Sequence, residues 1–195
     1  MKPTTKAAKE ASQDRRIART QRLLAEALME LILEKGYEAV TVRDITERAD
    51  VGYATFFRHY HDKEVLLHEV LNVVLEELVE LLQPQRVRGN AVALGTQLFH
   101  YVGGHSRLCR ALLGDKGSPV LVRQVLAAGT ANVLSDHTAR PGAPVPIEIA
   151  AHHMVASTLN LIEWWLEHDM PYPPEQMGLI YHELISRPTR EVAFT

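Results

Sequence analysis

Cysteine, aromatic residues and long apolar runs are scarce in this chain of 195 residues. The single cysteine, Cys109, cannot form an internal disulfide, as is usual for proteins of a reducing cytosol. Aromatic residues make up 6% of the chain, and no apolar run reaches the length of about 18 residues that a membrane-spanning helix needs. The lysines near the N-terminus are not followed by the apolar segment of a signal peptide, so we expect a cytoplasmic protein.

An overall excess of positive charge is also absent. Lys and Arg number 21 against 24 Asp and Glu, which gives a net charge of −3 with neutral histidines. Because a basic domain is the usual mark of nucleic-acid binding, this total argues mildly against DNA. The distribution is uneven, since the first 25 residues hold seven basic and two acidic groups and carry +5, against −8 for the rest. We interpret residues 1–13, which are polar and aperiodic, as a flexible basic arm.

Alternation of apolar and polar residues, the pattern of half-buried strands, does not occur over any useful length. Apolar residues recur at helical spacing instead, and clusters of Gly and Pro separate the helical segments. With 46% apolar residues the chain can form a sizeable core. We therefore predict an all-α protein. The expected helices are one that ends at Lys35-Gly36, short ones near 42–49 and 53–59, a long one that Asp62 caps and Pro84 ends, and others at 90–102, 106–113, 119–138, 147–168 and 174–187.

The segment 147–168 is apolar on nearly every side. A helix of this kind must be covered on all sides. In a chain of this size the pattern favours a second subunit, so we predict a homodimer. The candidate interface residues, drawn from this segment and the next helical one, are Trp164, Trp165, Met177 and Tyr181.

Residues 41–60 have the sequence form of a helix-turn-helix. Thr41 is followed three positions later by Asp44, which is the pattern of a capping box at a helix N-terminus. Ala49 is small enough for a crossing of two helices, and Phe56 can pack inward on the second helix. In a helix-turn-helix the second helix can enter the major groove, which is about 12 Å wide in B-DNA. The residues left on its outer side are Gly52, Tyr53, Ala54, Thr55, Arg58 and His59.

From residue 14 to residue 67 the sequence resembles the DNA-binding domain of the TetR/AcrR family of bacterial transcriptional regulators. The residues that carry the resemblance are Glu34-Lys35-Gly36-Tyr37, Thr41-Val42-Arg43-Asp44-Ile45, Ala49-Asp50-Val51, and Thr55-Phe56-Phe57-Arg58-His59-Tyr60 followed by Asp62-Lys63-Glu64. The remainder is similar in length, helix count and a Trp-Trp-Leu-Glu-His…Met-Pro-Tyr segment. The resemblance implies a helix-turn-helix domain over 14–67 and a helical regulatory and dimerisation domain over 68–195.

The resemblance also implies individual roles in binding DNA. Thr41 would meet a phosphate, because the free N–H groups and the dipole at a helix N-terminus favour an anion. Arg43 would contact a base edge or a nearby phosphate, while Tyr53 and Arg58 would determine the choice of operator. Three further residues would hold phosphates and set the register on the duplex. They are Thr55, His59 and Lys63.

Two positions depart from the pattern of the family. Phe57 lacks the phosphate-binding hydroxyl of the tyrosine that usually stands there, and Gly52 replaces a residue that is often polar. Small residues at positions 52 and 54 would let the backbone come close to DNA. The full predicted DNA-binding set is Thr41, Arg43, Gly52, Tyr53, Ala54, Thr55, Phe57, Arg58, His59 and Lys63.

The resemblance further implies a repressor that a small-molecule effector releases from a palindromic operator in double-stranded DNA. The effector would bind between helices of the C-terminal domain, in a pocket that is mostly apolar with few polar groups. The candidate lining residues are Tyr101, His105, Cys109, His153 and Met154.

Catalytic and metal sites find little support in the sequence. Glu148 and His152 stand at i and i+4 of one expected helix, but no HExxH motif or cysteine cluster accompanies them. The segment 114–118 lacks the residue order of a phosphate-binding loop. We predict no enzyme, no metal site and no cofactor. Two alternatives stay open, namely a helical enzyme or carrier with a vestigial motif, and a DNA-binding protein without an effector.

Overall fold

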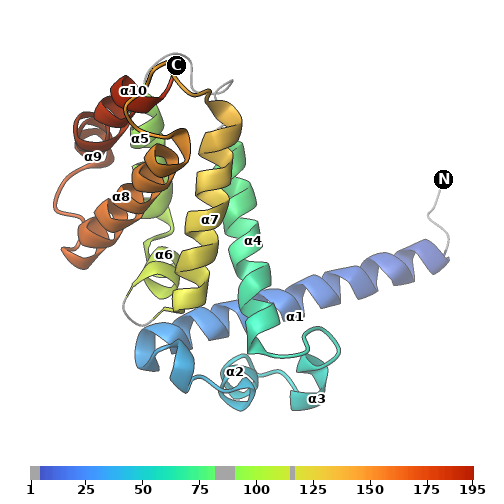
Figure 1. Ribbon diagram of the computed structural model, residues 1–195. Helices are drawn as coiled ribbons and strands as arrows, with labels where there is room; N and C mark the ends of the chain where they lie inside the picture. The colour runs from blue at the N-terminus through green and yellow to red at the C-terminus, as the bar shows by residue number, and fades with distance from the viewer. Residues whose placement is uncertain (1–4, 82–90, 115–116) are drawn as a thin grey trace. The chain divides into compact units, whose positions relative to one another are not determined.

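The computed structural model describes residues 5–81, 91–114 and 117–195, and Figure 1 shows that their regular structure is helical. An isolated β-bridge between Ala139 and Phe194 is the sole β-type pairing in these three segments. The all-α fold predicted from the sequence is confirmed. None of the helices within these segments is long and apolar enough to cross a membrane.

The chain divides into two compact units, Met1–Leu71 and Asn72–Thr195, a division that the sequence placed near residue 67. The helix α4 (Lys63–Leu81) begins in the first unit and ends in the second. Asp62 caps it as expected, since its Oδ1 accepts a hydrogen bond of 2.8 Å from the backbone N–H of Val65. Pro84, the expected end of this helix, lies outside the described residues.

The N-terminal unit buries a compact apolar core between its helices. Leu24 and Leu28 lie on one face of the first helix at a spacing of four residues, and both are fully buried. Ile45, Phe56 and Leu66 bring the other helices to the same core. Besides the start of α4, the elements of this unit are α1 (Thr5–Lys35), η1 (Tyr37–Ala39), α2 (Val42–Arg48) and α3 (Tyr53–Phe56).

The first helix is longer than the sequence predicted. Residues 5–13, interpreted above as part of a flexible arm, are the first turns of α1, and that interpretation is wrong for them. The reason is the composition of this stretch, because Ala, Lys and Glu are strong helix formers that need no apolar stripe where a helix faces solvent. Residues 1–4 lie outside the described part of the chain.

The second helix of the motif is shorter than expected, since it covers Tyr53–Phe56 and not 53–59. The chain continues in tight turns, in which the N–H of Arg58 donates to the Thr55 carbonyl at 3.1 Å and that of His59 to the Phe56 carbonyl at 2.9 Å. These bonds span three residues, as in a 3-10 helix. The helical path is therefore tightened before Tyr60, which packs into the core.

The C-terminal unit packs its helices around a second core. The Trp165 indole is fully buried and meets the Phe99 ring edge-on, with centroids 5.2 Å apart. Gly95 and Gly178 let two helices approach closely, because a Cβ atom at either position would collide with the facing helix. After α4, the helices are α5 (Ala91–Gly104), α6 (Ser106–Leu113), α7 (Pro119–Asp136), α8 (Ile147–Glu167), α9 (Pro174–Tyr181), the π-helical η2 (His182–Ser186) and α10 (Arg187–Ala193).

The last helical path runs from Pro174 to Ala193 and does not stop at residue 187 as predicted. Pro188 suggested a stop, because proline inside a helix removes a backbone hydrogen bond and clashes with the carbonyl four residues earlier. The π-helical turn of η2 ends two residues before this proline and widens the helix there. The path therefore continues to the penultimate residues of the chain.

Three of the four predicted dimer-interface residues cannot form an exposed surface. Trp165, Met177 and Tyr181 are 1%, 0% and 7% exposed within this chain's own core, so the prediction is wrong for them. The helical pattern alone did not distinguish the inward from the outward side of an apolar helix. Trp164 is 41% exposed, and its ring stacks on that of His168.

Candidate nucleic-acid interface

The helix α2 begins at a complete capping box. The N–H of Asp44 donates to Thr41 Oγ1 at 3.2 Å, and the N–H of Thr41 donates to Asp44 Oδ2 at 2.7 Å. Two backbone donors are thereby satisfied reciprocally, as the sequence predicted. The Lys35 ammonium lies 2.8 Å from the same carboxylate. This cation, with the Thr41 hydroxyl and N–H, holds the pKa of Asp44 well below its usual range.

The turn after α2 is a Schellman motif, in which hydrogen bonds close the end of the helix. The N–H of Val51 donates to the Thr46 carbonyl at 3.0 Å, and that of Asp50 donates to the Glu47 carbonyl at 3.3 Å. Asp50 takes the left-handed conformation, with φ 52, where glycine is usual. Aspartate tolerates this region better than most residues. The turn therefore fixes where α3 begins without a glycine at its sharpest point.

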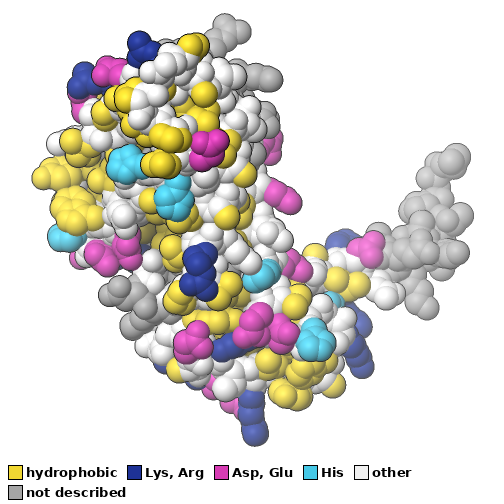
Figure 2. Space-filling view, viewed as in Figure 1, with side chains coloured by type: hydrophobic (Ala, Val, Ile, Leu, Met, Phe, Trp, Pro, Cys, Tyr) yellow, Lys and Arg dark blue, Asp and Glu magenta, His cyan; other side chains and the backbone are white. Residues whose placement is uncertain are grey.

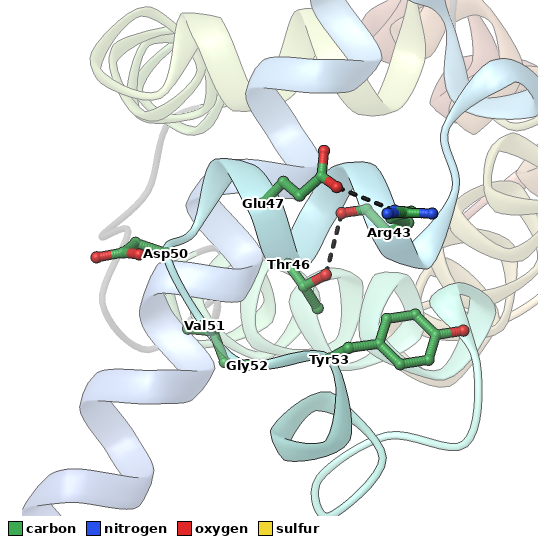
Figure 3. A pocket seen from close by; sticks show the side chains of 7 residues that line it. All are labelled: Arg43, Thr46, Glu47, Asp50, Val51, Gly52 and Tyr53. Atoms are coloured by element: carbon green, nitrogen blue, oxygen red, sulfur yellow. Dashed lines mark hydrogen bonds and ion pairs between the residues drawn. The ribbon is translucent and has the colours of Figure 1, made fainter.

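A hollow of about 570 Å³ lies between α2 and the start of α3, shown in Figure 3. The Tyr53 ring extends outward from the start of α3, and Asp50 lies on the opposite side of the hollow. Tyr53 is 56% exposed, and Gly52 and Ala54 beside it are exposed as well. The residues around the hollow are Arg43, Thr46, Glu47, Asp50, Val51, Gly52 and Tyr53.

The charges at this hollow are mixed. Arg43 Nε lies 3.0 Å from Glu47 Oε1, and both side chains are largely exposed. An exposed pair of this kind stabilises a helix by only about 0.3–0.5 kcal/mol, so a stronger anion can replace the carboxylate. Asp50 adds a second negative charge to the lining of the hollow. A polyanion that meets this surface gains Arg43 but is opposed by Glu47 and Asp50.

The remaining predicted residues differ in accessibility. Thr41, Phe57 and Arg58 are exposed, whereas Thr55 and His59 are half-buried. The Phe57 ring packs edge-on against Tyr53, with centroids 5.2 Å apart. Figure 2 shows hydrophobic side chains gathered over α3, with Lys and Arg side chains near them. The exposed surface around α3 is thus aromatic at its centre and charged at its edges.

Lys63 is placed differently from the sequence prediction. Its ammonium donates to the backbone carbonyls of Tyr37 at 3.0 Å and Val40 at 2.9 Å, with a longer contact of 3.5 Å to that of Glu38. An ammonium has three donors, and all of them are directed to these carbonyls. In this conformation Lys63 ties the start of α4 to η1, and its predicted phosphate contact stays a prediction.

Sequence reasoning missed the residue that fixes α2 on α1. Arg48 donates two hydrogen bonds to Glu34, at 2.8 and 2.7 Å, and a third of 3.3 Å to Glu30. The Arg48 side chain lowers the pKa of Glu34. Two planar N–H donors facing one carboxylate fix orientation as well as position. The sequence signal was a pair of acidic residues four positions apart on the helix that precedes the motif.

Two protein-family models match the sequence, one in each structural unit. Residues 24–70 match the family described as "Bacterial regulatory proteins, tetR family", and residues 93–187 match a transcriptional regulator C-terminal region of the same family. The chain belongs to the TetR family of DNA-binding bacterial transcriptional regulators. This is a family of regulators and not of enzymes.

Curated relatives of this TetR-family chain include distant ones. It is 24% identical over 175 residues to YxbF of Bacillus subtilis, an HTH-type transcriptional regulator, a match that covers 87% of this chain and 45% of that protein. The chain spans about half the length, or less, of the curated relatives it matches.

Solved structures share the fold of this TetR-family protein. A TetR regulator from Streptococcus agalactiae matches with a TM-score of 0.68 at 21% identity, over 90% of this chain and 98% of that one. Pseudomonas aeruginosa NalD, the secondary repressor of the MexAB-OprM multidrug efflux pump, matches with a TM-score of 0.66 at 19% identity, over 92% of this chain and 98% of NalD.

The C-terminal unit of this TetR-family protein holds a cavity of about 560 Å³. Met154 lines it, whereas the other four residues predicted for a ligand site do not. Tyr101 stacks on His105 and donates to Glu77, and Cys109 is buried in the core, where burial raises the pKa of its thiol to about 11. His153 is exposed. These four therefore lie outside the lining of this cavity, since helical periodicity does not show which inward residues border an empty space.

Metal ligands also do not converge in the described segments. No group of three or more His, Cys, Asp or Glu side chains in them is placed to hold a metal ion. Glu148 and His152 are both exposed on α8.

Proposed function

We propose that this protein is a homodimeric repressor that binds a palindromic DNA operator and leaves it when a small molecule binds the C-terminal unit. The observation that carries the proposal is the exposed start of α3. Gly52, Tyr53 and Ala54 protrude beside Arg43 on a turn that backbone hydrogen bonds hold in place. Small residues beside an exposed tyrosine let the backbone approach base edges in a major groove.

Phosphate contacts would surround this reading surface. Thr41 at the start of α2, and Thr55, Arg58 and His59 around α3, are the described residues that can provide them. Such contacts fix register and orientation, while Arg43 and Tyr53 determine sequence preference. Lys63 contributes as a positioning residue, because its ammonium holds the loop before α2.

The basic N-terminal segment supports DNA binding as a helix and not as a flexible arm. Four arginines lie within two turns of α1 and are exposed, and they supply most of the positive charge near the N-terminus. Arginines on one helix suit a run of phosphates, and affinity for the duplex should fall steeply with salt. They are Arg15, Arg16, Arg19 and Arg22.

Exposed apolar side chains on the last helices support a dimer. Ile149 and Trp164 on α8, Leu179 on α9 and Leu184 on η2 are all large and exposed. Where large exposed apolar side chains come together in one patch, they commonly mark a protein–protein interface. Two copies joined there would place two reading surfaces on one duplex, where half-sites lie about 34–36 Å apart.

The effector response rests on the cavity and on α4. Leu75 and Leu78 of α4 line the cavity, and the same helix begins at Lys63 in the N-terminal unit. A molecule that binds one conformation of α4 more tightly shifts the equilibrium between the DNA-binding and the released conformation. The shift equals the difference between its binding free energies for the two conformations, typically about 1–3 kcal/mol. NalD, which shares the fold, is a repressor, and this supports the same sign of regulation here. Such a protein acts in the bacterial cytoplasm.

A selection from random duplexes at moderate salt tests the proposal. The full chain should enrich a palindrome, and Arg43→Ala or Tyr53→Ala should change the enriched sequence. A matched control is Glu167→Ala, at an exposed position near the end of α8, which should leave the sequence unchanged. If the wild-type protein enriches no sequence, the proposal fails.

A further inference from the structure

The cavity of the C-terminal unit is apolar over most of its wall. Its lining comes from α4, α5, α7 and α8 together with the chain's last residues. Val125 on α7 and Leu159 and Ile162 on α8 are among the aliphatic side chains. A volume of about 560 Å³ lies within the usual range for small-molecule pockets, and such walls favour a hydrocarbon body.

Polar side chains gather at one end of this cavity. Asp136 and His137 lie at the C-terminal end of α7, and Arg190 and Thr195 come from the end of the chain. The two segments are joined there, because the N–H of Thr195 donates to the Thr138 carbonyl at 3.1 Å and the His137 ring lies 4.9 Å from that of Phe194. Figure 1 shows the end of α7 beside the C-terminus. The cavity therefore has one polar end.

Arg190 is the only arginine or lysine side chain that lines this cavity among the residues described. The structure shows no ion pair between Arg190 and a carboxylate of the described residues, whereas Arg187 and Arg110 do have ion pairs. Arg187, one turn earlier, pairs with Glu183, and Arg110 lies 3.1 Å from Asp169. Arg190 is exposed to solvent beside the cavity, and the two parallel N–H donors of a guanidinium match the two oxygens of a carboxylate.

Asp136 also carries a charge at this end, and solvent screens its repulsion of an anion as it screens the attraction of Arg190. Asp136 is exposed to solvent, and its Oδ1 already accepts a hydrogen bond of 3.3 Å from Ser135 Oγ. The His137 Nδ1 lies 3.0 Å from the Val133 carbonyl, which only accepts, so this nitrogen carries a hydrogen and the ring is held in place. Arg190 is thus the group with unused donors at the polar end.

We propose that this cavity binds an amphipathic organic monoanion, with a hydrocarbon chain among Val125, Leu159 and Ile162 and a carboxylate against Arg190. This inference rests on the proposed function, since the bound anion is the effector. The cavity lining combines an apolar wall with one guanidinium. The hydrocarbon chain therefore supplies most of the affinity, and Arg190 selects the sign of the head-group charge. A cationic amphiphile of equal length lacks the guanidinium contact and faces its repulsion.

Titration calorimetry of the full chain without DNA tests the assignment. The probes are decanoate, decanol and decylamine, which share one chain length and differ in the charge of the head group. Decanoate should bind saturably and up to about fivefold tighter than the other two, as expected for an exposed pair of opposite charges. Arg190→Gln should remove this preference and leave decanol binding unchanged, whereas Arg190→Lys should keep part of it.

The control variant is Arg187→Gln, which removes an exposed arginine of the same helix that does not line the cavity. It should bind decanoate like the wild type. Equal affinity for decanoate and decanol, tighter binding of decylamine, no effect of Arg190→Gln, or no saturable binding of any probe would each overturn the inference. The duplex selection is run on the same preparations. Sequence-selective DNA binding without a carboxylate preference refutes the ligand class alone, whereas decanoate binding without DNA selectivity refutes the proposed function.

Discussion

The Lys63 ammonium lies 4.3 Å from the centroid of the Tyr37 ring and donates a hydrogen bond of 3.0 Å to the carbonyl of the same residue. A second bond of 2.9 Å reaches the Val40 carbonyl. The first residue of α4 thereby holds both ends of η1, which precedes the capping box of α2. A residue that motif reasoning assigns to DNA is thus part of the support of the motif.

Replacing Lys63 with methionine should destabilise the N-terminal unit by about 1–2 kcal/mol, because partly buried carbonyls lose hydrogen bonds to a charged donor. Chemical denaturation measures this loss. The salt dependence of DNA binding should stay as in the wild type. The matched variant Arg58→Ala, at an exposed position, should leave stability unchanged and reduce the slope of log K against log salt by about 0.9. A Lys63→Met variant that lowers the slope of log K against log salt and unfolds at the wild-type denaturant concentration would show that Lys63 binds phosphate and does not support the motif.

Replacing Asp50 with asparagine should strengthen DNA binding by about 1.4- to fivefold at low salt, because an exposed charge beside the reading surface contributes about 0.2–1 kcal/mol. Stability should not change, since asparagine adopts the left-handed conformation as readily as aspartate. Fluorescence anisotropy at two salt concentrations measures the gain, which should shrink as salt screens the charge. Asp169→Asn is a control at another left-handed aspartate, in the C-terminal unit, and should leave binding unchanged. Weaker DNA binding by the Asp50 variant would contradict this reading of the surface charge.

The N-terminal unit should lose stability in acid. The pKa of Asp44 is lowered in the folded state by Lys35 and Thr41, so the unfolded chain binds more protons as the pH falls through the ordinary aspartate range near about 3.9. The stabilisation is therefore complete above that range and is lost below it. Denaturant unfolding as a function of pH measures the slope. Asp44→Asn should be less stable at neutral pH and should lose less on acidification, and an unchanged acid slope in this variant would refute the assignment.

Gly178→Ala should destabilise the C-terminal unit by about 1–3 kcal/mol or more. A Cβ atom there would stand 2.6 Å from the Thr96 backbone nitrogen and 2.9 Å from the Val92 carbonyl oxygen, and backbone atoms cannot rotate away. Gly104→Ala is the control, because a Cβ at that helix end meets no atom within 4 Å. Thermal unfolding should separate the two variants. Equal melting temperatures for the two would show that the contact between α5 and α9 is looser than in the structure.

Local patterns predicted much of this fold. The capping box at Thr41, the cap at Asp62 and most helix bounds in the C-terminal unit follow from residues close together in the sequence. Their physical basis is the short-range hydrogen bonding of a few neighbours, which needs no knowledge of the rest of the chain.

The features that local patterns missed depend on tertiary contacts. Lys63 reaches carbonyls more than twenty residues earlier, and Arg48 reaches α1. The cavity residue Arg190 is defined by the meeting of two distant segments. The inward burial of Trp165 follows from packing on Phe99, whereas its neighbour Trp164 has the same residue type and remains exposed. Periodicity indicates an apolar helix but does not indicate which neighbour covers each side.

We propose that the surface of Arg43, Gly52, Tyr53 and Ala54 reads DNA in the major groove. Methylation-interference footprinting on the selected duplex tests this contact. We expect two patches of major-groove interference centred about 10–10.5 base pairs apart, or a multiple of that, and weaker interference at particular base pairs with Tyr53→Ala. Interference confined to the minor groove, or a pattern that Tyr53→Ala leaves unchanged, would contradict it.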